Sequence, residues 1–298
     1  KSLVENIPDI IYTADIEGTI TYVSPSVLPI TGFSVEEIVG LNLPEKIYVN
    51  YSDSLRFKEE IFRYGIVKNF VSKFYRKDHS HWWGSTCAHV IKSKDGSFIS
   101  INGIVKDIST QKVAQDELNY HAVHDNLTGL INRAEFEKRV SELLVKTTKS
   151  SDTHAMFFMD LDQFKVVNDT CGHVAGDQLL HELGQLLQGI IAKQSSLARL
   201  GGDEFGLLME GCTVVEANLM AEEVLRAIAN YPFRWAGKVF KVGVSIGVAV
   251  INKESSSFTE LFRQADAACY FAKDMGRNRI HTYHIDDAEL ATRHSDMN

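Results

Sequence analysis

Arg199-Leu200-Gly201-Gly202-Asp203-Glu204-Phe205-Gly206 sets two glycines and two acids in a turn between two apolar segments. Glycine lets a backbone approach a phosphate or a base closely, and a divalent cation prefers hard carboxylate oxygens. The run therefore indicates nucleotide chemistry. Gly-Gly-Asp is also compatible with the type I′ turn of an ordinary β-hairpin, so polar groups elsewhere in the chain must decide between the two interpretations.

Strands and helices alternate on both sides of this turn, over roughly residues 125–285. The order predicts an α/β sheet domain with helices on both faces. The expected strands are residues 155–159, 197–200, 205–209, 239–250 and 279–283, and the expected helices are residues 176–192, 213–229 and 258–275.

Three polar patterns accompany the turn. Asp160-Leu161-Asp162 ends an apolar strand, where carboxylates can gather a metal beside Asp203 if the two strands are neighbours. Asn168 and Asp177, nine residues apart with glycines between them, can read the edge of a guanine base. The third pattern is the pair Lys273 and Arg277, four apart in an expected helix and so on one face, where they can bind phosphate. Taken singly, each pattern has a structural explanation as a capped helix, a solvated basic face or a plain turn, and for the Lys273 and Arg277 pair alone this explanation is the favoured one.

Taken together, these patterns resemble one family, the GGDEF domain of diguanylate cyclases, which join two GTP molecules into cyclic di-GMP. The fold expected from the resemblance is that of the nucleotidyl cyclase catalytic domains. The matching segments are residues 125–133, 160–165, 168–173, 176–177, 201–205, 244–247 and 272–279.

The resemblance implies a metal and a catalytic acid at the turn. Asp160 and Asp203 would bind Mg²⁺ or Mn²⁺ through their carboxylates, and Leu161 through its backbone carbonyl. Asp203 would also assist deprotonation of an attacking 3′-hydroxyl, directly or through the metal, with Glu204 as a supporting acid.

The resemblance also implies a GTP site. Asn168 and Asp177 would select guanine, with His173 near the nucleotide. The groups expected near the phosphates are Phe164, Lys165, Gly201 and Gly202, with Lys273 and Arg277 neutralising the triphosphate. Because each domain binds one GTP, two domains must face each other, and a homodimer is expected.

One departure from the family pattern precedes the turn. Many of these cyclases carry Arg-x-x-Asp there and bind their product through it, whereas this chain has Ala192-Lys193-Gln194-Ser195. We predict that product inhibition through this site is absent. Tight binding of cyclic di-GMP by the isolated domain in calorimetry would contradict that prediction.

The first 108 residues predict an antiparallel sheet with helices across one face, so the whole chain is α+β. The expected strands are residues 10–14, 19–23, 69–75, 82–91 and 98–105, and the expected helices are residues 35–39 and 53–63. The order of short motifs resembles a PAS sensor domain. These motifs are Asn6-Ile7-Pro8-Asp9-Ile10-Ile11, Asp15-Ile16-Glu17-Gly18, Tyr22-Val23-Ser24-Pro25-Ser26, Thr31-Gly32-Phe33 with Glu36-Glu37, and Asp107-Ile108-Ser109.

PAS domains commonly dimerise and hold a small ligand between helices and sheet, but the ligand here is unknown. No cysteine precedes Cys87, so a flavin adduct is not expected, and residues 44–63 contain no histidine for a haem. Trp82 and Trp83 face opposite ways on a strand, so at most one of them can line a pocket, and plain sheet packing is the favoured interpretation.

Residues 109–124 predict a signalling helix between the two domains. Ser109-Thr110 is a candidate N-cap, and Ala114, Leu118 and His121 form a narrow stripe suited to a two-helix coiled coil. A plain exposed linker helix is the alternative. We expect the homodimer to form through the PAS domain, this helix and the facing GGDEF domains.

Composition limits the partners and the compartment. The chain has 298 residues and a formal net charge of -8, so neither nucleic acid nor anionic lipid is an expected partner. Cys87, Cys171, Cys212 and Cys269 show no paired metal spacing, which favours a reduced, cytoplasmic setting. No segment is expected to contact a membrane, although an anchor upstream of this chain is compatible with a start at Lys1, which lacks a methionine and indicates a fragment.

The polar tail, residues 286–298, resembles the connector that leads into EAL phosphodiesterase domains; a free terminal helix is the alternative. If such a domain follows in the full protein, a competing function arises, in which the GGDEF domain binds GTP mainly to regulate hydrolysis of cyclic di-GMP. The intact acids and cations favour the cyclase.

Overall fold

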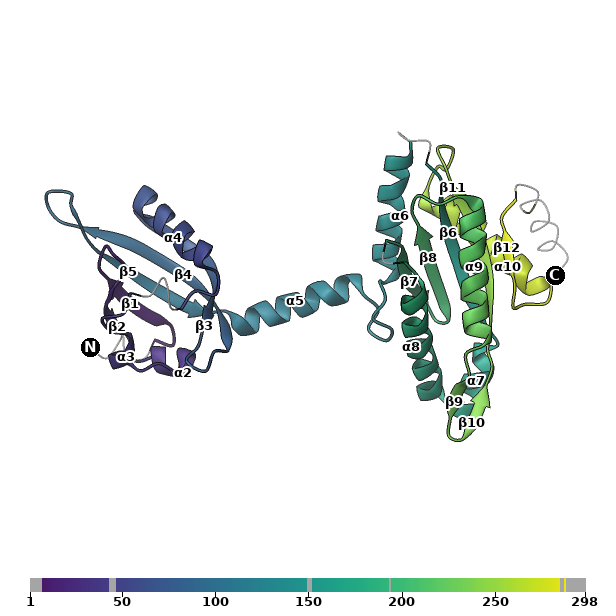
Figure 1. Cartoon of the computed structure of the whole chain (residues 1–298), viewed down its shortest axis with the longest axis horizontal. Coiled ribbons are helices and arrows are strands. Elements are labelled where there is room, and N and C mark those ends of the chain that lie inside the picture. The colour runs from purple at the N-terminus through teal and green to yellow at the C-terminus, as the bar shows by residue number, and fades with distance from the viewer. Residues whose placement is uncertain (1–6, 43–46, 149–151, 193, 285–286, 288–298) are drawn as a thin grey trace. The chain divides into compact units, whose positions relative to one another are not determined.

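The computed structural model describes residues 7–42, 47–148, 152–192, 194–284 and 287. Contacts divide the chain into a first unit, Lys1–Leu118, and a second unit, Asn119–Asn298 (Figure 1). Among the described helices, none combines the length and the apolar character that crossing a bilayer requires. Apart from Asp287, the tail for which a helix was expected lies outside the described residues.

The first unit is built on a five-stranded sheet in the order β2-β1-β5-β4-β3, in which every neighbouring pair is antiparallel. This confirms the predicted antiparallel sheet. The elements are β1 (Ile10–Ala14), β2 (Ile20–Val23), α2 (Val27–Thr31), α3 (Val35–Ile38), α4 (Tyr51–Tyr64), β3 (Ile66–Tyr75), β4 (His81–Lys92) and β5 (Phe98–Asp107). Side chains from all three helices and from the sheet enclose a common cavity, so the helices cover the same face.

Helix α5 (Ser109–Val123) occupies the predicted connector. Ser109 is its first residue, and the Ser109 hydroxyl accepts a hydrogen bond from the Trp83 backbone N–H at 2.9 Å. The expected N-cap role of Ser109 is therefore wrong: the Asp107 carboxylate instead accepts from the Ser109 N–H at 2.8 Å. No side chain of α5 is buried, so the helix exposes its apolar residues along its whole length.

The second unit has a five-stranded sheet in the order β12-β11-β6-β8-β7, antiparallel except for the pair β11 and β12. Helices α8 and α9 cover one face of this sheet and α6 and α10 cover the other (Figure 1). Their apolar side chains pack in two separate core clusters, one on each face. The elements are α6 (Arg133–Thr147), β6 (His154–Asp162), α7 (Phe164–Cys171), α8 (His173–Ile190), β7 (Ser196–Gly201), β8 (Glu204–Met209), α9 (Val214–Ala229), β9 (Phe233–Trp235), β10 (Lys238–Phe240), β11 (Gly243–Ile251), α10 (Phe258–Asp274) and β12 (Ile280–Thr282).

Three features of this unit differ from the prediction. The single strand expected over residues 239–250 is split, because β10 turns back onto β9 through Ala236 and Gly237, which both have positive φ. Helices α6 and α7 were not predicted. The signal for α6 is nevertheless present, since Phe136, Val140 and Leu143 recur at helical spacing and are buried.

Candidate active site

The central strand β6 brings the two acidic motifs together. Asp160 lies opposite Glu204 of β8 in the antiparallel register. Beyond that pair, the Leu161 N–H donates to the backbone oxygen of Asp203 at 3.3 Å. The prediction that the acids of β6 meet those of the glycine turn is confirmed, and Leu161 itself is buried beneath them.

The turn between β7 and β8 depends on its two glycines. Gly201 and Gly202 have φ values of 149° and 52°, in the range that favours glycine. Asp203 does not have positive φ, so the turn is not the type I′ turn of an ordinary hairpin, which needs positive φ at both central residues. A Cβ built at either glycine would meet nothing within 4 Å. The space beside the turn is therefore open to a ligand.

Lys273, near the end of α10, reaches this acidic corner. Its Nζ lies 2.7 Å from the Asp160 carboxylate. Burial by itself would lower the pKa of Lys273, but the hydrogen bond that Lys273 donates to Asp160 and the neighbouring acids raise that pKa overall. The ammonium group therefore remains charged at neutral pH and supplies one positive charge to the corner.

The carboxylates of the corner repel one another. Burial raises the pKa of Asp160, with Asp203 and Asp162 adding to the rise against the opposing effect of Lys273. Burial also raises the pKa of Glu204, and Asp160, Asp266 and Asp203 add to it. One lysine thus does not neutralise the site, and a bound cation would relieve the remaining repulsion.

The donor set fits a divalent metal that shares its ligands with a substrate. Within the described part of the chain, no three His, Cys, Asp or Glu side chains converge on a complete metal site. Mg²⁺ commonly takes only one or two carboxylates and completes its shell with water and phosphate oxygens. The carboxylates of Asp160 and Asp203 and the backbone oxygen of Leu161 suit that arrangement.

Helices α7 and α8 form a second polar corner. Asn168 packs against Gly176, where an added Cβ would lie 2.0 Å from the Asn168 Oδ1 atom. That oxygen is buried and has no hydrogen-bond partner among the described residues. An unpaired buried acceptor beside the exposed Asp177 is available to a ligand. Phe164 is half-buried in the same corner, and Lys165 and His173 are exposed there.

The predicted pairing of Lys273 with Arg277 on one helical face is wrong. Helix α10 ends at Asp274, and Arg277 and Asn278 both have positive φ, so Arg277 lies in the turn beyond the helix. The Asp162 carboxylate holds this turn, because its Oδ2 atom accepts the Asn278 N–H at 2.8 Å and its Oδ1 atom accepts the Ser245 hydroxyl at 2.8 Å. Asp162, predicted only as one of the carboxylates at the end of the apolar strand, is thus the anchor of the Arg277 turn.

Arg199, which precedes the glycine turn, was assigned no role from the sequence. Its Nη2 and Nε atoms donate to the Gly202 carbonyl at 2.8 and 3.0 Å, and its Nη1 atom donates to the Asp125 carboxylate at 3.1 Å. Burial opposes ionisation of Asp125, but hydrogen bonds from Thr128 and the charge of Arg199 lower the Asp125 pKa overall. The sequence does carry a signal that could have predicted this bridge. It is the combination of an arginine just before the glycine turn and an acid at the start of the domain.

Comparison with known proteins agrees with this geometry. Residues 122–279 match the family described as diguanylate cyclase, GGDEF domain, and residues 8–110 match the PAS domain family. The probable diguanylate cyclase DgcE of Escherichia coli (strain K12) is 34% identical over 98% of this chain, which spans 26% of that protein. The cyclic di-GMP phosphodiesterase PdeB of Shewanella oneidensis is 27% identical over 97% of this chain, which spans 33% of that protein.

A solved structure of a GGDEF domain also aligns with this chain. The coiled coil and GGDEF domain of DgcB from Caulobacter crescentus, in complex with c-di-GMP, aligns with a TM-score of 0.55 and 25% identity. The alignment covers 59% of this chain and 93% of that one. The chain therefore belongs to the GGDEF family of diguanylate cyclase domains and carries a PAS domain ahead of its GGDEF domain.

Proposed function

We propose that this chain is a diguanylate cyclase, which condenses two GTP molecules into cyclic di-GMP and releases two molecules of pyrophosphate. The observation that carries the proposal is the acidic corner, where Asp160 lies opposite Glu204 beside the Asp203 turn and Lys273 reaches in at 2.7 Å. In each of two steps, a 3′-hydroxyl oxygen forms a bond to an α-phosphorus and the bond to pyrophosphate breaks. A bound Mg²⁺ or Mn²⁺ would offset the phosphate charge.

The residues take distinct roles in this proposal. Asp160, Asp203 and the Leu161 carbonyl hold the metal, and Asp203 assists removal of the hydroxyl proton, with Glu204 in support. Asn168 and Asp177 select guanine. The groups assigned to the rest of the nucleotide and its phosphates are Phe164, Lys165, His173, Gly201, Gly202, Lys273 and Arg277. Two GGDEF domains face each other in a homodimer, and a reaction that consumes GTP belongs in the cytoplasm.

The test is direct synthesis. Purified chain incubated with GTP and Mg²⁺ is expected to yield cyclic di-GMP on chromatography, and Asp203→Ala is expected to abolish the product without lowering the unfolding temperature. Glu210→Ala is the matched control, because Glu210 is an exposed acid just beyond the other end of β8. Wild-type chain that makes no product, or an Asp203→Ala variant that makes as much as wild type, would contradict the proposal.

A second candidate function rests on the similarity to PdeB over 97% of this chain. In that case the GGDEF domain binds GTP and regulates a phosphodiesterase domain elsewhere in the full protein. GTP binding measured by calorimetry, together with no cyclic di-GMP from the same sample, would favour this regulator over the cyclase.

A further inference from the structure

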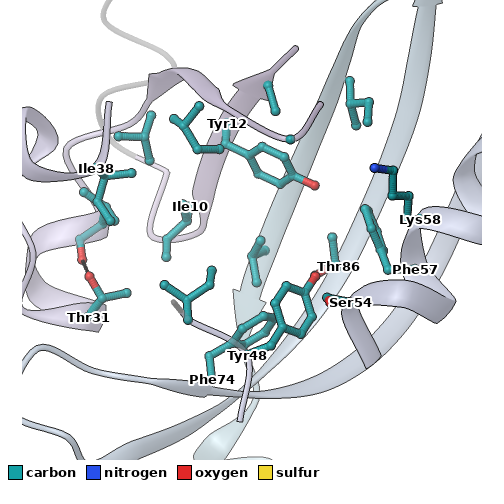
Figure 2. A pocket seen from close by; sticks show the side chains of 18 of the residues that line it. Ile10, Tyr12, Thr31, Ile38, Tyr48, Ser54, Phe57, Lys58, Phe74 and Thr86 are labelled. Atoms are coloured by element: carbon teal, nitrogen blue, oxygen red, sulfur yellow. Dashed lines mark hydrogen bonds between the residues drawn. The ribbon is translucent and has the colours of Figure 1, made fainter. Parts of the chain in front are cut away.

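The PAS domain contains a cavity of about 130 Å³ between its helices and its sheet (Figure 2). Its walls are largely aromatic and aliphatic. Phe74 is central to them, with its ring centroid 4.8 Å from that of Tyr48 and 5.0 Å from that of Trp82. Trp82 therefore does more than pack the sheet. As expected for adjacent strand residues, Trp83 instead contacts the side chains of Lys73 and Lys112.

The size of the cavity limits its occupant. A cavity of roughly 150 Å³ lined by apolar side chains holds one benzene molecule, whereas pockets for drug-sized ligands start near roughly 300 Å³. At about 130 Å³, this cavity takes a single ring with a short substituent. Flavin and haem are both much larger, which agrees with the lack of a suitably placed cysteine or histidine in this domain.

Two classes of polar group line the cavity. Ser54 and Thr31 are satisfied, because their hydroxyls donate to the backbone carbonyls of Tyr51 and Val27, each at 2.7 Å. The Trp82 Nε1 and Thr86 Oγ1 atoms are also buried, yet neither has a hydrogen-bond partner among the described residues. An unpaired buried donor is costly to a fold, so a pair of them on one cavity indicates a missing acceptor.

Two tyrosines also line this cavity. The rings of Tyr12 and Tyr48 enter from different walls, with their oxygens toward the interior (Figure 2). No described residue hydrogen-bonds either phenol. The Tyr12 ring lies against Gly103 of β5, where an added Cβ would come within 2.4 Å of it. Burial raises the pKa of both tyrosines, so both phenols stay protonated and can donate at neutral pH.

Among the described residues, no buried charged side chain lines the cavity. Its ionisable lining residues besides the tyrosines are Glu17 and Lys58, and both side chains are exposed to solvent. A charged ligand buried in this space would lack a buried counter-charge and would pay the full cost of desolvation. The cavity therefore favours an uncharged occupant.

We propose that the PAS cavity binds an uncharged, single-ring aromatic compound that bears a carbonyl group. The ring packs among Phe57, Phe74 and Trp82, and the carbonyl oxygen accepts hydrogen bonds from the unpaired donors on Thr86 and its neighbours. The ligand has roughly six to nine non-hydrogen atoms, set by the cavity volume.

Three probes of similar size test the ligand class on the full chain by calorimetry. Acetophenone has the ring and the carbonyl, ethylbenzene has the same carbon skeleton without the carbonyl, and benzoate carries a negative charge. Acetophenone is expected to bind about tenfold more tightly than ethylbenzene, the effect of one or two hydrogen bonds, and benzoate is expected to bind most weakly. Equal binding of acetophenone and ethylbenzene, tightest binding of benzoate, or no binding of acetophenone would overturn the proposal.

A pair of isosteric variants tests the donors. Thr86→Val removes an unpaired hydroxyl, so it is expected to raise the unfolding temperature of the ligand-free chain while erasing most of the preference for acetophenone over ethylbenzene. Thr31→Val is the matched control, because the Thr31 hydroxyl lines the same cavity but is already bonded to Val27. It is expected to lower the unfolding temperature and to leave the preference intact.

The unfolding temperature and the ratio of the acetophenone and ethylbenzene affinities together distinguish a ligand site from a structural or water-filled cavity. If water alone satisfies Thr86, Thr86→Val leaves the ratio of the two affinities unchanged, and the proposal fails. If Thr86→Val does not fold, Tyr48→Phe replaces it as the test, since that change also removes one unpaired donor and keeps the ring. A preference unchanged in Tyr48→Phe would then count against the proposal.

Discussion

Glu204 shows how burial and neighbouring charge act together on one carboxylate. Its pKa is raised, first by burial and then by Asp160, Asp266 and Asp203. A raised pKa means that the folded state holds the proton more tightly than the unfolded state does. In the metal-free protein, the ionised Glu204 side chain therefore lowers the free energy of unfolding.

The pH dependence of stability follows from this sign. Below the ordinary pKa of 4.5, Glu204 is protonated in both the folded and the unfolded state, and this destabilisation is absent. It develops as pH rises through the raised value, so the stability of the protein falls over that range. Glu204→Gln is therefore expected to raise the unfolding temperature at pH 7 to 8, and the gain should vanish near pH 4. Thermal melts in chelator across this range would check it. A gain that grows toward low pH would show that the sign is wrong.

Gly176 determines where Asn168 can lie. Because an added Cβ would fall 2.0 Å from the Asn168 Oδ1 atom, Gly176→Ala must displace that side chain. We expect the KM for GTP to rise by about tenfold or more, as for the loss of a hydrogen bond to substrate, with a smaller change in kcat. Gly189→Ala is the control on the same helix, where a Cβ meets nothing within 4 Å. Equal effects of the two changes would refute the role of the contact.

At the scale of single residues, sequence patterns predicted groups that act through short local motifs. The meeting of Asp160 with the Asp203 turn followed from the end of one strand and the start of another. The bridge of Arg199 and the anchoring by Asp162 were not predicted, because Arg199 reaches Asp125 across 74 residues and Asp162 reaches Asn278 across 116. Arg277 was misplaced because helical spacing was extended past the true end of α10.

At the scale of elements, the β7–β8 hairpin is held at its turn by Arg199. Lysine at this position would keep the charge but could not donate to Gly202 and Asp125 together. Arg199→Lys is therefore expected to lower the rate of cyclic di-GMP synthesis about tenfold or more, mainly through kcat, because the Asp203 turn loses its support. Steady-state kinetics at saturating Mg²⁺ would measure this.

Arg139→Lys is the matched control for this change. Arg139 donates to Ser196 on the same hairpin at 3.0 Å, but it contacts the start of β7 and not the turn. Because the partly exposed Arg139 side chain pairs with Glu135 and Ser196 and does not reach the turn, its replacement should change the rate less than about twofold. Similar losses in both variants would assign the effect to general loosening of the hairpin.

Periodicity located the ends of several elements in both domains to within one residue. The first strand, Ile10–Ala14, has the predicted bounds, and Phe258–Asp274 differs by one residue. The break between β10 and β11 was missed because residues 239–250 keep an apolar pattern through it, and the Ala236-Gly237 turn that pairs β10 with β9 lies ahead of this segment. Such breaks are set by pairing partners distant in sequence, which periodicity does not record.

At the scale of the whole molecule, the cyclase proposal requires two chains, and we expect α5 to pair them. Leu118 is 64% exposed and Val113 is 57% exposed, on nearly opposite sides of the helix. The predicted stripe contains Leu118 and not Val113. Leu118→Asp is therefore expected to lower turnover per chain several-fold at low protein concentration, with recovery as the concentration rises.

Val113→Asp is the control for this pairing, and sedimentation with activity measured at the same concentrations would compare the two. A loss confined to Val113→Asp would place the contact on the other side of α5. If turnover per chain stayed unchanged after the dimer was disrupted, the model in which dimerisation controls activity would be wrong.

The free energy of the bridge from Asp125 through Arg199 to Gly202 indicates how strongly a signal could act on the catalytic turn. Asp125 lies two residues beyond the end of α5, and both side chains of the ion pair are mostly buried. Charge-assisted hydrogen bonds of this kind are worth about 1.5 to 3 kcal/mol, which corresponds to roughly a ten- to hundredfold change in an equilibrium. A twist of the connector that parts these two side chains is therefore expected to shift the balance between a supported and an unsupported catalytic turn by about that factor.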